Sequence, residues 1–477
     1  MSEKAEFLRY ATPNEMRTIV REDLGFYHAV IIGAVYEFED GFDVKSPSSY
    51  FAPLKRCIDQ HPFFSVTVGD RHTEKAFYQR VPSINLEDHI TIVDDSNVAA
   101  DPLGATGKVL VPELDLPFTA GNPPWRIVVL PLNPFECFIA FSFSHMIGDG
   151  PTGIAFHKTF LVGCRGTPVV EPAAIVTPPA NPLTEPFDTP ERLPISWKFL
   201  LEPLIALFMP NFLVKLLGMR LGASTVNEGT FTGGIMTHNP EKYYTKLRIR
   251  EIKAPLVHNA IWAARAHDAK LTGTMQTLIA RAVSKAVPDP KFTNLVAETP
   301  ANMRRSIGVS NDVDGQFVSG GYIPFPRSDA TGPLTDKEWA SASASTRELA
   351  ATAVRLHDQP VGLLRYAPSI RKWTLSKIGK SRDSSFSVSN VGAFDVSQGD
   401  GVTEKETARI TKMVFAQPGH VASSPLSFNV ISVKGGDLVY TVTWQPGSLG
   451  LGLSEEQEDK VVEEICASVD QGFKDLA

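Results

Sequence analysis

The chain has 477 residues, of which 43% are hydrophobic and 21% are charged, a composition typical of soluble globular proteins and too apolar for a disordered chain. Because this length exceeds what one hydrophobic core usually organises, we expect two domains. The formal net charge of −7 argues against clustered Lys and Arg that would bind a phosphate backbone, so nucleic acid is not an expected partner.

The cysteines and the first residues indicate the compartment. Four cysteines occur without a Cys-x-x-Cys pair or a zinc-like spacing, so we expect no metal site and a reducing environment. The first nine residues carry charges of both signs and lack the apolar run of a signal peptide. A cytoplasmic location is therefore predicted.

Apolar periodicity and turn residues predict a mixed α/β first part. In chain order the predicted elements are a strand at 27–38, a helix at 47–60, paired strands at 125–132 and 137–144, and a helix near 152–162. Residues 166–194 contain eight prolines, too many for a regular element, and are interpreted as a linker. The predicted domains are residues 1–185 and 186–477.

The second part repeats the mixture of strands and helices. Its predicted strands are 243–252, 293–298, 385–390, 409–415, 426–433 and 438–444, and its predicted helices are 254–270, 274–287, 336–356, 362–377 and 454–473. No internal repeat of 20 to 50 residues is visible.

One apolar stretch, from Trp197 to Leu221, approaches the length of a membrane span, but Glu202, Pro203, Pro210 and Lys215 interrupt it. We expect no transmembrane segment there. Two interpretations stay open: a pair of short helices packed under the domain junction, or an interfacial helix that contacts a membrane or an apolar substrate entrance.

The strand at 137–144 leads directly to His145 in a turn, and Asp149 and Gly150 follow. A neutral imidazole accepts a proton from a hydroxyl or amine that attacks a carbonyl, so His145 is a candidate general base. Asp149 either orients the imidazole or turns away and fixes the loop through a salt bridge. The other interpretation of His145 is a structural histidine at a strand end.

Two further segments accompany this motif: Ala301-Asn302-Met303-Arg304 and Ser389-Asn390-Val391-Gly392. Over nearly its full length the chain resembles the chloramphenicol acetyltransferase-like superfamily, whose members share His-x-x-x-Asp after a strand. It is most similar to the fungal alcohol acetyltransferases and the condensation-related branch. The Ser-Asn-Val-Gly segment stands in place of the Asp-Phe-Gly-Trp-Gly signature of the plant-type enzymes.

The resemblance implies an α/β (α+β) fold of two similar sandwich domains with a tunnel between them and His145 at its middle. It also implies that Asp149 points away from the reaction and pairs with an arginine across the cleft, which maps to Arg304, or to its neighbour Arg305. Gly150 is expected to be structural at the site. Without the resemblance, a solvated surface charge is an equal interpretation of Arg304.

The Ser-Asn-Val-Gly segment reads from its residues alone as a strand end that enters a turn. The resemblance implies that this loop shapes the site, with Asn390 holding it. Three serines, Ser387, Ser389 and Ser427, are unranked candidates for donors to an oxyanion or for positions in the tunnel.

Several alternatives lack their sequence patterns. No glycine-rich phosphate loop follows a strand and no Gly-x-Ser-x-Gly is present, so CoA is expected to be held by the tunnel wall and a serine hydrolase is disfavoured. His157 is interpreted as a surface or packing residue. His420 is interpreted as a loop residue or one at the tunnel mouth.

We therefore expect an acyl-CoA-dependent O-acyltransferase in which His145 deprotonates an alcohol that attacks the thioester directly. By resemblance the acyl group is acetyl, and the apolar surroundings suggest a small, largely apolar specialised metabolite as acceptor. We expect a monomer with acetyl-CoA as co-substrate and no tightly bound cofactor. Two alternatives remain: transfer from a carrier-protein thioester to form an ester or amide, and a noncatalytic binding protein of the same fold.

Overall fold

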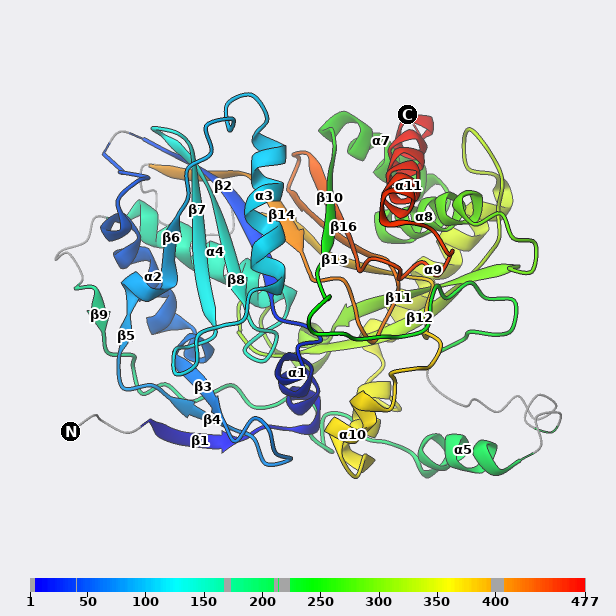
Figure 1. Cartoon of the computed structure of the whole chain (residues 1–477), viewed down its shortest axis with the longest axis horizontal. Helices are drawn as coiled ribbons and strands as arrows, with labels where there is room; N and C mark the ends of the chain where they lie inside the picture. The colour runs from blue at the N-terminus through cyan, green and yellow to red at the C-terminus, as the bar shows by residue number, and fades with distance from the viewer. Residues whose placement is uncertain are drawn as a thin grey trace.

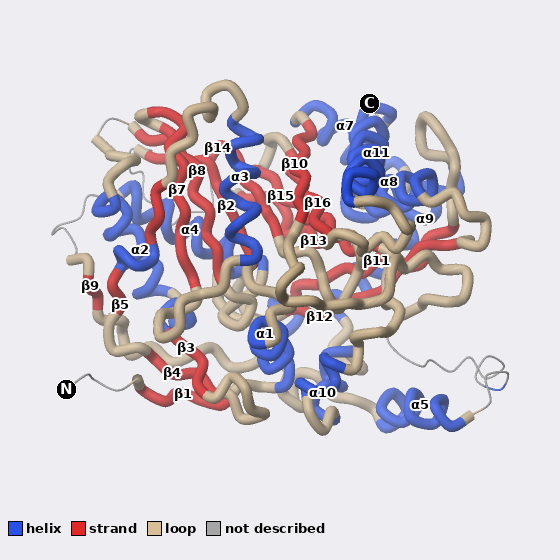
Figure 2. Tube along the Cα trace, viewed as in Figure 1, coloured by secondary structure: helices blue, strands red, loops and turns tan. Residues whose placement is uncertain are grey.

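The computed structural model describes residues 5–39, 41–166, 173–209, 213, 224–395 and 407–476. Two large sheets lie side by side with helices packed on them, one in each half of the molecule (Figure 1). Figure 2 shows the strands of both sheets running next to each other across the middle of the structure.

The first sheet has five strands in the order β14-β2-β8-β7-β6. The strands are β14 (Ala408–Ala416), β2 (Val30–Phe38), β8 (Glu136–Phe143), β7 (Trp125–Asn133) and β6 (Ile90–Ile92). β8 is central and pairs antiparallel with both β2 and β7. Helices α2 (Phe51–Gln60) and α4 (Gly150–Arg165) pack together on one face, and α3 (Pro102–Asp115) covers the other.

The residues of β8 alternate between two buried faces. Phe141 and Phe143 enter the core with α4, whereas Phe138 and Ala140 enter the cluster under α3. Burial on both faces explains why this strand reads as a nearly continuous apolar run. Central placement fixes the register of β8 and therefore the position of the turn that follows it.

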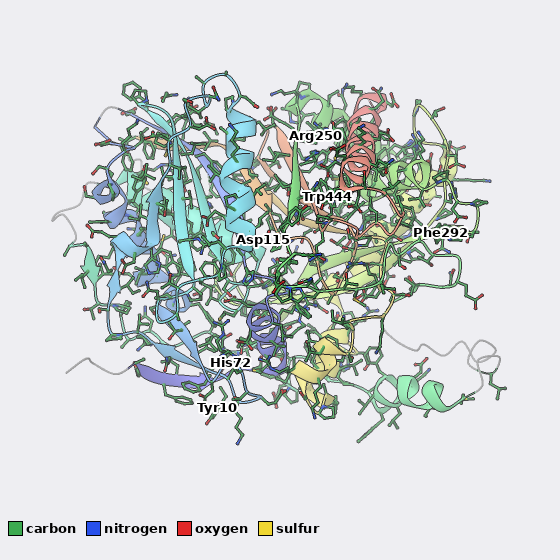
Figure 3. All side chains as sticks on the ribbon, viewed as in Figure 1. Tyr10, His72, Asp115, Arg250, Phe292 and Trp444 are labelled. Atoms are coloured by element: carbon green, nitrogen blue, oxygen red, sulfur yellow. The ribbon has the colours of Figure 1, made fainter. Side chains whose placement is uncertain are left out.

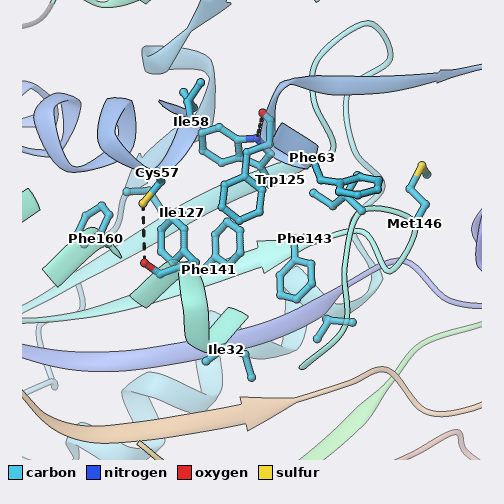
Figure 4. Packing of buried hydrophobic residues seen from close by; sticks show 14 of the residues in the cluster. Ile32, Cys57, Ile58, Phe63, Trp125, Ile127, Phe141, Phe143, Met146 and Phe160 are labelled. Carbon is cyan, nitrogen blue, oxygen red and sulfur yellow. Dashed lines mark hydrogen bonds between the residues drawn. The ribbon is translucent and has the colours of Figure 1, made fainter. Parts of the chain in front are cut away.

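Aromatic side chains fill the core behind that turn (Figure 4). The rings of Phe141 and Phe156 stack with centroids 3.7 Å apart, and Trp125 donates its indole N–H to the carbonyl of Phe64 at 2.8 Å. Stacked, fully buried rings resist displacement, so they give the strand end a rigid support.

The second sheet has six strands in the order β10-β16-β15-β13-β11-β12. The strands are β10 (Lys246–Ile252), β16 (Leu438–Trp444), β15 (Ser427–Val433), β13 (Phe386–Phe394), β11 (Asn294–Asn302) and β12 (Val318–Pro326). Helices α7 (Ala254–Ala266), α8 (Leu271–Ala286), α9 (Asp336–Val354) and α11 (Glu455–Asp475) cover one face. The opposite face of β15 carries polar residues toward β14.

β14 crosses between the halves. The sequence predicts it correctly as a strand of the second part, but it is hydrogen-bonded to β2 at the edge of the first sheet. Strand exchange of this kind has no local sequence signal, because pairing depends on the fold around it. The boundary at residue 185 stays a prediction, and the first sheet is completed by residues beyond it.

Smaller elements close the junction from below in the view of Figure 1. They are α1 (Pro13–Asp23), α10 (Ile370–Leu375) and the three-stranded sheet β1-β4-β3, with strands Glu6–Tyr10, Phe77–Arg80 and Val66–Gly69. α1 packs against α10, so an N-terminal helix contacts an element of the C-terminal half. The short strands β5 (Ile84–Asn85) and β9 (Ile175–Val176) pair with each other.

Two predictions need correction. The helix expected at 362–377 is two short pieces, a 3-10 helix at Pro360–Tyr366 and α10, because Pro368 interrupts the helical pattern. The turn expected at the Ser-Asn-Val-Gly segment is an irregularity inside β13, with Gly392 at φ +90°. Part of the proline-rich segment is packed, since Phe187 and Leu193 are buried.

The apolar stretch from Trp197 includes α5 (Trp197–Phe208), which lies away from the main body (Figure 1). Most of residues 210–223 lie outside the described residues. Among the described helices, none has the length and apolar character needed to cross a membrane.

Candidate active site

His145 lies in the turn after β8, where three contacts hold its neighbours. The hydroxyl of Ser144 donates to the carboxylate of Glu22 on α1. The carbonyl of Met146 accepts from the Tyr78 hydroxyl at 2.7 Å and from the Gln316 side-chain amide at 3.2 Å. These contacts come from both halves of the chain, so the turn is fixed at their junction.

Asp149 is the N-cap of α4. It accepts from the backbone N–H of Thr152 at 3.3 Å and from the backbone N–H of Phe317 at 2.9 Å. Both of its oxygens accept from Arg304, each at 2.8 Å. This bidentate ion pair joins the His145 turn to the second half of the molecule.

Arg304 is fully buried and follows directly after β11. It also donates to the carbonyls of Val313 and Gly315, each at 3.0 Å. Its guanidinium carbon lies 4.6 Å from the centroid of the Phe317 ring. Arg305 is exposed, so the neighbouring arginine is not the partner of Asp149.

The His145 ring is half-buried, and its Nδ1 is enclosed without a hydrogen-bond partner. Its side chain makes no hydrogen bond with another residue in the described ranges. Burial, followed by the positive charge of Arg17, lowers the pKa of His145 to about 4. The imidazole is therefore neutral at neutral pH, which is the form that accepts a proton.

Two other rings stand beside His145. The Tyr27 ring centroid lies 5.6 Å from that of His145 and 5.9 Å from that of His420. Tyr27 and His420 line a small cavity together with Arg21, about 10 Å³ in volume, room for a single water molecule. Burial lowers the pKa of His420 to about 3, so this imidazole is also neutral.

The Ser-Asn-Val-Gly segment reaches the His145 motif through Val391. A Cβ placed on Gly150 would meet the Cγ1 of Val391 at 2.5 Å. A larger residue at position 150 would therefore have to displace the Val391 side chain. Asn390 does not contact the motif: it donates to the hydroxyl of Thr272 at 3.0 Å and accepts from the backbone N–H of Gly392 at 2.9 Å.

The serine candidates lie on the polar faces of β13 and β15. The Ser387 hydroxyl donates to that of Ser427 at 3.0 Å, which donates to Asn429 at 3.3 Å. Gln417 bonds the same Asn429 oxygen at 2.7 Å and accepts from the Tyr27 hydroxyl at 2.7 Å. A chain of hydrogen bonds thus connects these serines to the ring beside His145.

Ser389 faces the same side of β13 as Ser387, opposite Asn429 in the register. It is half-buried, and its hydroxyl makes no hydrogen bond within the described part of the chain.

His157 differs from His145 in its burial and in its hydrogen-bond partners. It is fully buried in α4, where its Nδ1 lies 2.8 Å from the Tyr36 hydroxyl and its Nε2 lies 2.9 Å from the carbonyl of Ile32. Both nitrogens are occupied, so this histidine is a packing residue and not a surface one.

Sequence reasoning missed several residues that shape this site: Glu22, Tyr27, Gln417 and Asn429. Each lies far along the chain from its partner, and no spacing rule connects them. Within the described ranges, no group of three or more His, Cys, Asp or Glu side chains is placed to hold a metal ion.

Comparisons with known proteins identify the family. The alcohol acetyltransferase family model matches residues 77–467. A probable alcohol acetyltransferase of Aspergillus fumigatus is 22% identical over 451 residues, which cover 89% of this chain and 92% of that protein. One of Fusarium pseudograminearum is 24% identical over 332 residues, which cover 67% and 65%.

Solved structures share the fold. The trichothecene 15-O-acetyltransferase of Fusarium sporotrichioides has a TM-score of 0.65 at 11% identity, covering 98% of this chain and 94% of that one. The condensation domain of the monacolin K polyketide synthase has a TM-score of 0.56 at 10% identity, covering 99% and 98%. The predicted fold class is confirmed, and with a family model that spans most of its length the chain belongs to the alcohol acetyltransferase family.

Proposed function

We propose that the protein transfers an acyl group from an acyl-CoA to the hydroxyl of a small acceptor, with His145 as general base. The observation that carries this proposal is a neutral imidazole without a partner residue, in a turn that both halves of the chain hold. A structural histidine would resemble His157, which has both nitrogens hydrogen-bonded. Membership of the alcohol acetyltransferase family supports acyl transfer and makes acetyl the expected acyl group.

The reaction proceeds in one displacement through a tetrahedral intermediate. His145 takes the proton of the acceptor hydroxyl while that oxygen attacks the thioester carbonyl carbon. The carbonyl oxygen becomes an oxyanion, and its collapse reforms the C=O bond and breaks the C–S bond. The imidazolium returns its proton to the departing CoA thiolate, so the base is regenerated.

Asp149 and Arg304 act as positioning residues in this scheme. The Asp149 carboxylate and the Arg304 guanidinium are hydrogen-bonded to each other and to backbone groups. Neither group is therefore free to exchange a proton with the substrate. The pair holds the turn in which His145 stands. Gly150 has no side chain and so leaves room for the Val391 side chain at the start of α4.

Among the serine candidates, Ser389 best fits an oxyanion donor. The hydroxyls of Ser387 and Ser427 already donate to neighbouring oxygens, whereas Ser389 has no partner among the described residues. Preorganised donors of this kind lower acyl-transfer barriers by about 3 kcal/mol each. The cavity beside Tyr27 has room for about one water molecule, so binding of the donor and the acceptor requires the side chains around it to rearrange.

The test is CoA thiol release from acetyl-CoA with a panel of alcohols, comparing wild type with His145→Ala. The variant is expected to lose about a hundredfold or more in kcat. His157→Gln is a control for general damage, because it alters a histidine of the adjacent helix. Equal rates for wild type and His145→Ala would show that His145 is not the general base.

A further inference from the structure

Two arginines on α1 enter the junction without a counter-charge. Arg17 and Arg21 are four residues apart and so lie on one face of the helix. The Nε atoms of both are buried and have no hydrogen-bond partner. Within the described ranges, no carboxylate lies within salt-bridge distance of either guanidinium.

Two acidic groups from the second half of the chain have other partners in this region. Asp383 accepts from the Tyr322 hydroxyl at 3.2 Å and lies 3.7 Å from the Lys377 ammonium. Glu298 accepts from the hydroxyls of Ser423 and Ser384. The charges of Glu298 and Asp188 act on Arg17, but neither carboxylate lies within salt-bridge distance of it in the described ranges.

Arg17 and Arg21 are half-buried, and their enclosed Nε–H groups lack partners, which is unfavourable because burial removes water and nothing replaces its hydrogen bonds. A pair of such groups is a preformed site for a carboxylate, whose two oxygens match the planar fork of arginine. The burial cost is consistent with the lowered pKa of Arg17, which burial and the charge of Arg21 bring to about 10.

These arginines are next to the candidate base. Arg21 lines the small cavity together with Tyr27 and His420, and the Tyr27 ring contacts that of His145. The charges of Arg17 and Arg21 both lower the pKa of His145. An anion bound by them would lie beside the reacting hydroxyl.

We propose that Arg17 and Arg21 bind a carboxylate on the acyl acceptor, which makes hydroxy acids the substrate class of this site. The inference rests on the proposed function and deepens it. The phosphates of CoA are the other anions present, but the extended pantetheine arm separates them from the thioester. An anion site beside the base therefore suits a carboxylate of the acceptor better than the phosphates of CoA. The largely apolar acceptor expected from the sequence would leave both guanidinium groups unpaired.

The kinetic test uses acceptors that differ only at one end: omega-hydroxyhexanoate, its methyl ester and hexanol. Wild type should show kcat/KM at least about tenfold higher for the carboxylate than for the ester. Arg17→Met and Arg21→Met should lose this preference through KM; the preference is read as the ratio of kcat/KM for the carboxylate to that for hexanol within each variant. Arg17→Lys and Arg21→Lys should retain part of the preference, because they retain the charge.

A binding test separates this inference from the proposed reaction. Calorimetric titration of His145→Ala with hydroxyhexanoate and its methyl ester should show preferential binding of the carboxylate, which Arg17→Met or Arg21→Met in the same background abolishes. That result supports the arginine site even if wild type releases no thiol. Unchanged carboxylate preference in the Met variants overturns it. An increased KM for acetyl-CoA with unchanged acceptor preference also overturns it, because the arginines would then bind the donor.

Discussion

At the scale of single residues, the two histidines of the β8–α4 region show how partners decide a role. His157 has a hydrogen bond at each nitrogen and is held neutral in the core. His145 is half-buried, and within the described ranges its ring makes no hydrogen bond to another side chain. An unsatisfied buried polar group calls for an explanation, and for His145 we propose that the substrate supplies the missing partner, whereas His157 is a packing residue.

The pKa of His145 predicts the pH dependence of the reaction. Because the folded-state pKa is lowered to about 4, the basic form is fully present well above that pH and is lost as pH falls through it. With hexanol as acceptor, kcat/KM should be flat above about pH 5. Rate measurements after brief exposure to each pH check this, and an acid limb near the ordinary histidine pKa contradicts it.

Removal of Arg17 should move that acid limb. Its charge is the second cause of the lowered His145 pKa, after burial, so Arg17→Met raises the pKa and shifts the limb to higher pH. Arg17→Lys keeps the charge and should leave the limb near its wild-type position. Identical profiles for wild type and Arg17→Met would show that the arginine does not act on His145.

The buried ion pair is a stability element as well as a positioning one. Arg304→Met leaves the Asp149 carboxylate buried and unpaired, which should lower the free energy of unfolding by about 3–5 kcal/mol. Arg305→Met alters the exposed neighbour and should change it by less than about 0.5 kcal/mol. Urea unfolding measures both, and equal small effects would contradict the pairing.

At the scale of elements, the N-terminus of α4 and strand β13 meet at one contact. Gly150→Ala places a methyl group against Val391, which should cost about 1–3 kcal/mol and reduce activity by displacing the His145 turn. Val391→Ala in the same chain removes the clash. A double-mutant cycle should therefore show recovery of both stability and rate, and strictly additive losses would show that the two residues do not touch.

Sequence patterns recovered the elements with strong periodicity and local signals. β7, β8 and His145 follow from alternation and from the glycines and proline after the strand, and α11 from its Ser454 cap. α3 was missed, because two glycines and a proline dilute its helical pattern. α1 was missed despite a capping box at Thr12 and Glu15, a signal present in the sequence.

In the candidate site too, residues that are close in sequence were predictable, whereas contacts between residues far apart in sequence were not. His145 and Asp149 are four residues apart and form a recognisable pattern, and the family resemblance supplied Arg304. Glu22 reaches Ser144 across 122 residues of sequence. Contacts of that kind depend on how α1 packs at the junction, which neither composition nor periodicity encodes.

At the scale of the whole molecule, the contacts that tie the two halves include β14 in the first sheet, the Asp149–Arg304 pair, and α1 against α10. Asp115, at the end of α3, lies near the middle of the molecule (Figure 3), where its carboxylate binds Thr245. Such contacts bury polar groups that only the other half satisfies, so the halves depend on each other for stability.

Separation of the halves should therefore abolish folding. A fragment of residues 1–185 lacks β14, which leaves β2 as an unpaired edge of the first sheet. We expect the fragment to aggregate or to lack near-ultraviolet circular dichroism, while the full chain unfolds in urea in one transition. A folded, soluble fragment with a cooperative transition would show instead that the first domain is autonomous.

The most direct test of the account is thiol release from acetyl-CoA by wild type and by His145→Ala, with the His157→Gln variant beside them. The account predicts acceptor-dependent release by wild type, a loss of about a hundredfold or more in His145→Ala, and near-normal specific activity in the fraction of His157→Gln that folds. Undiminished acceptor-dependent release by folded His145→Ala would contradict it.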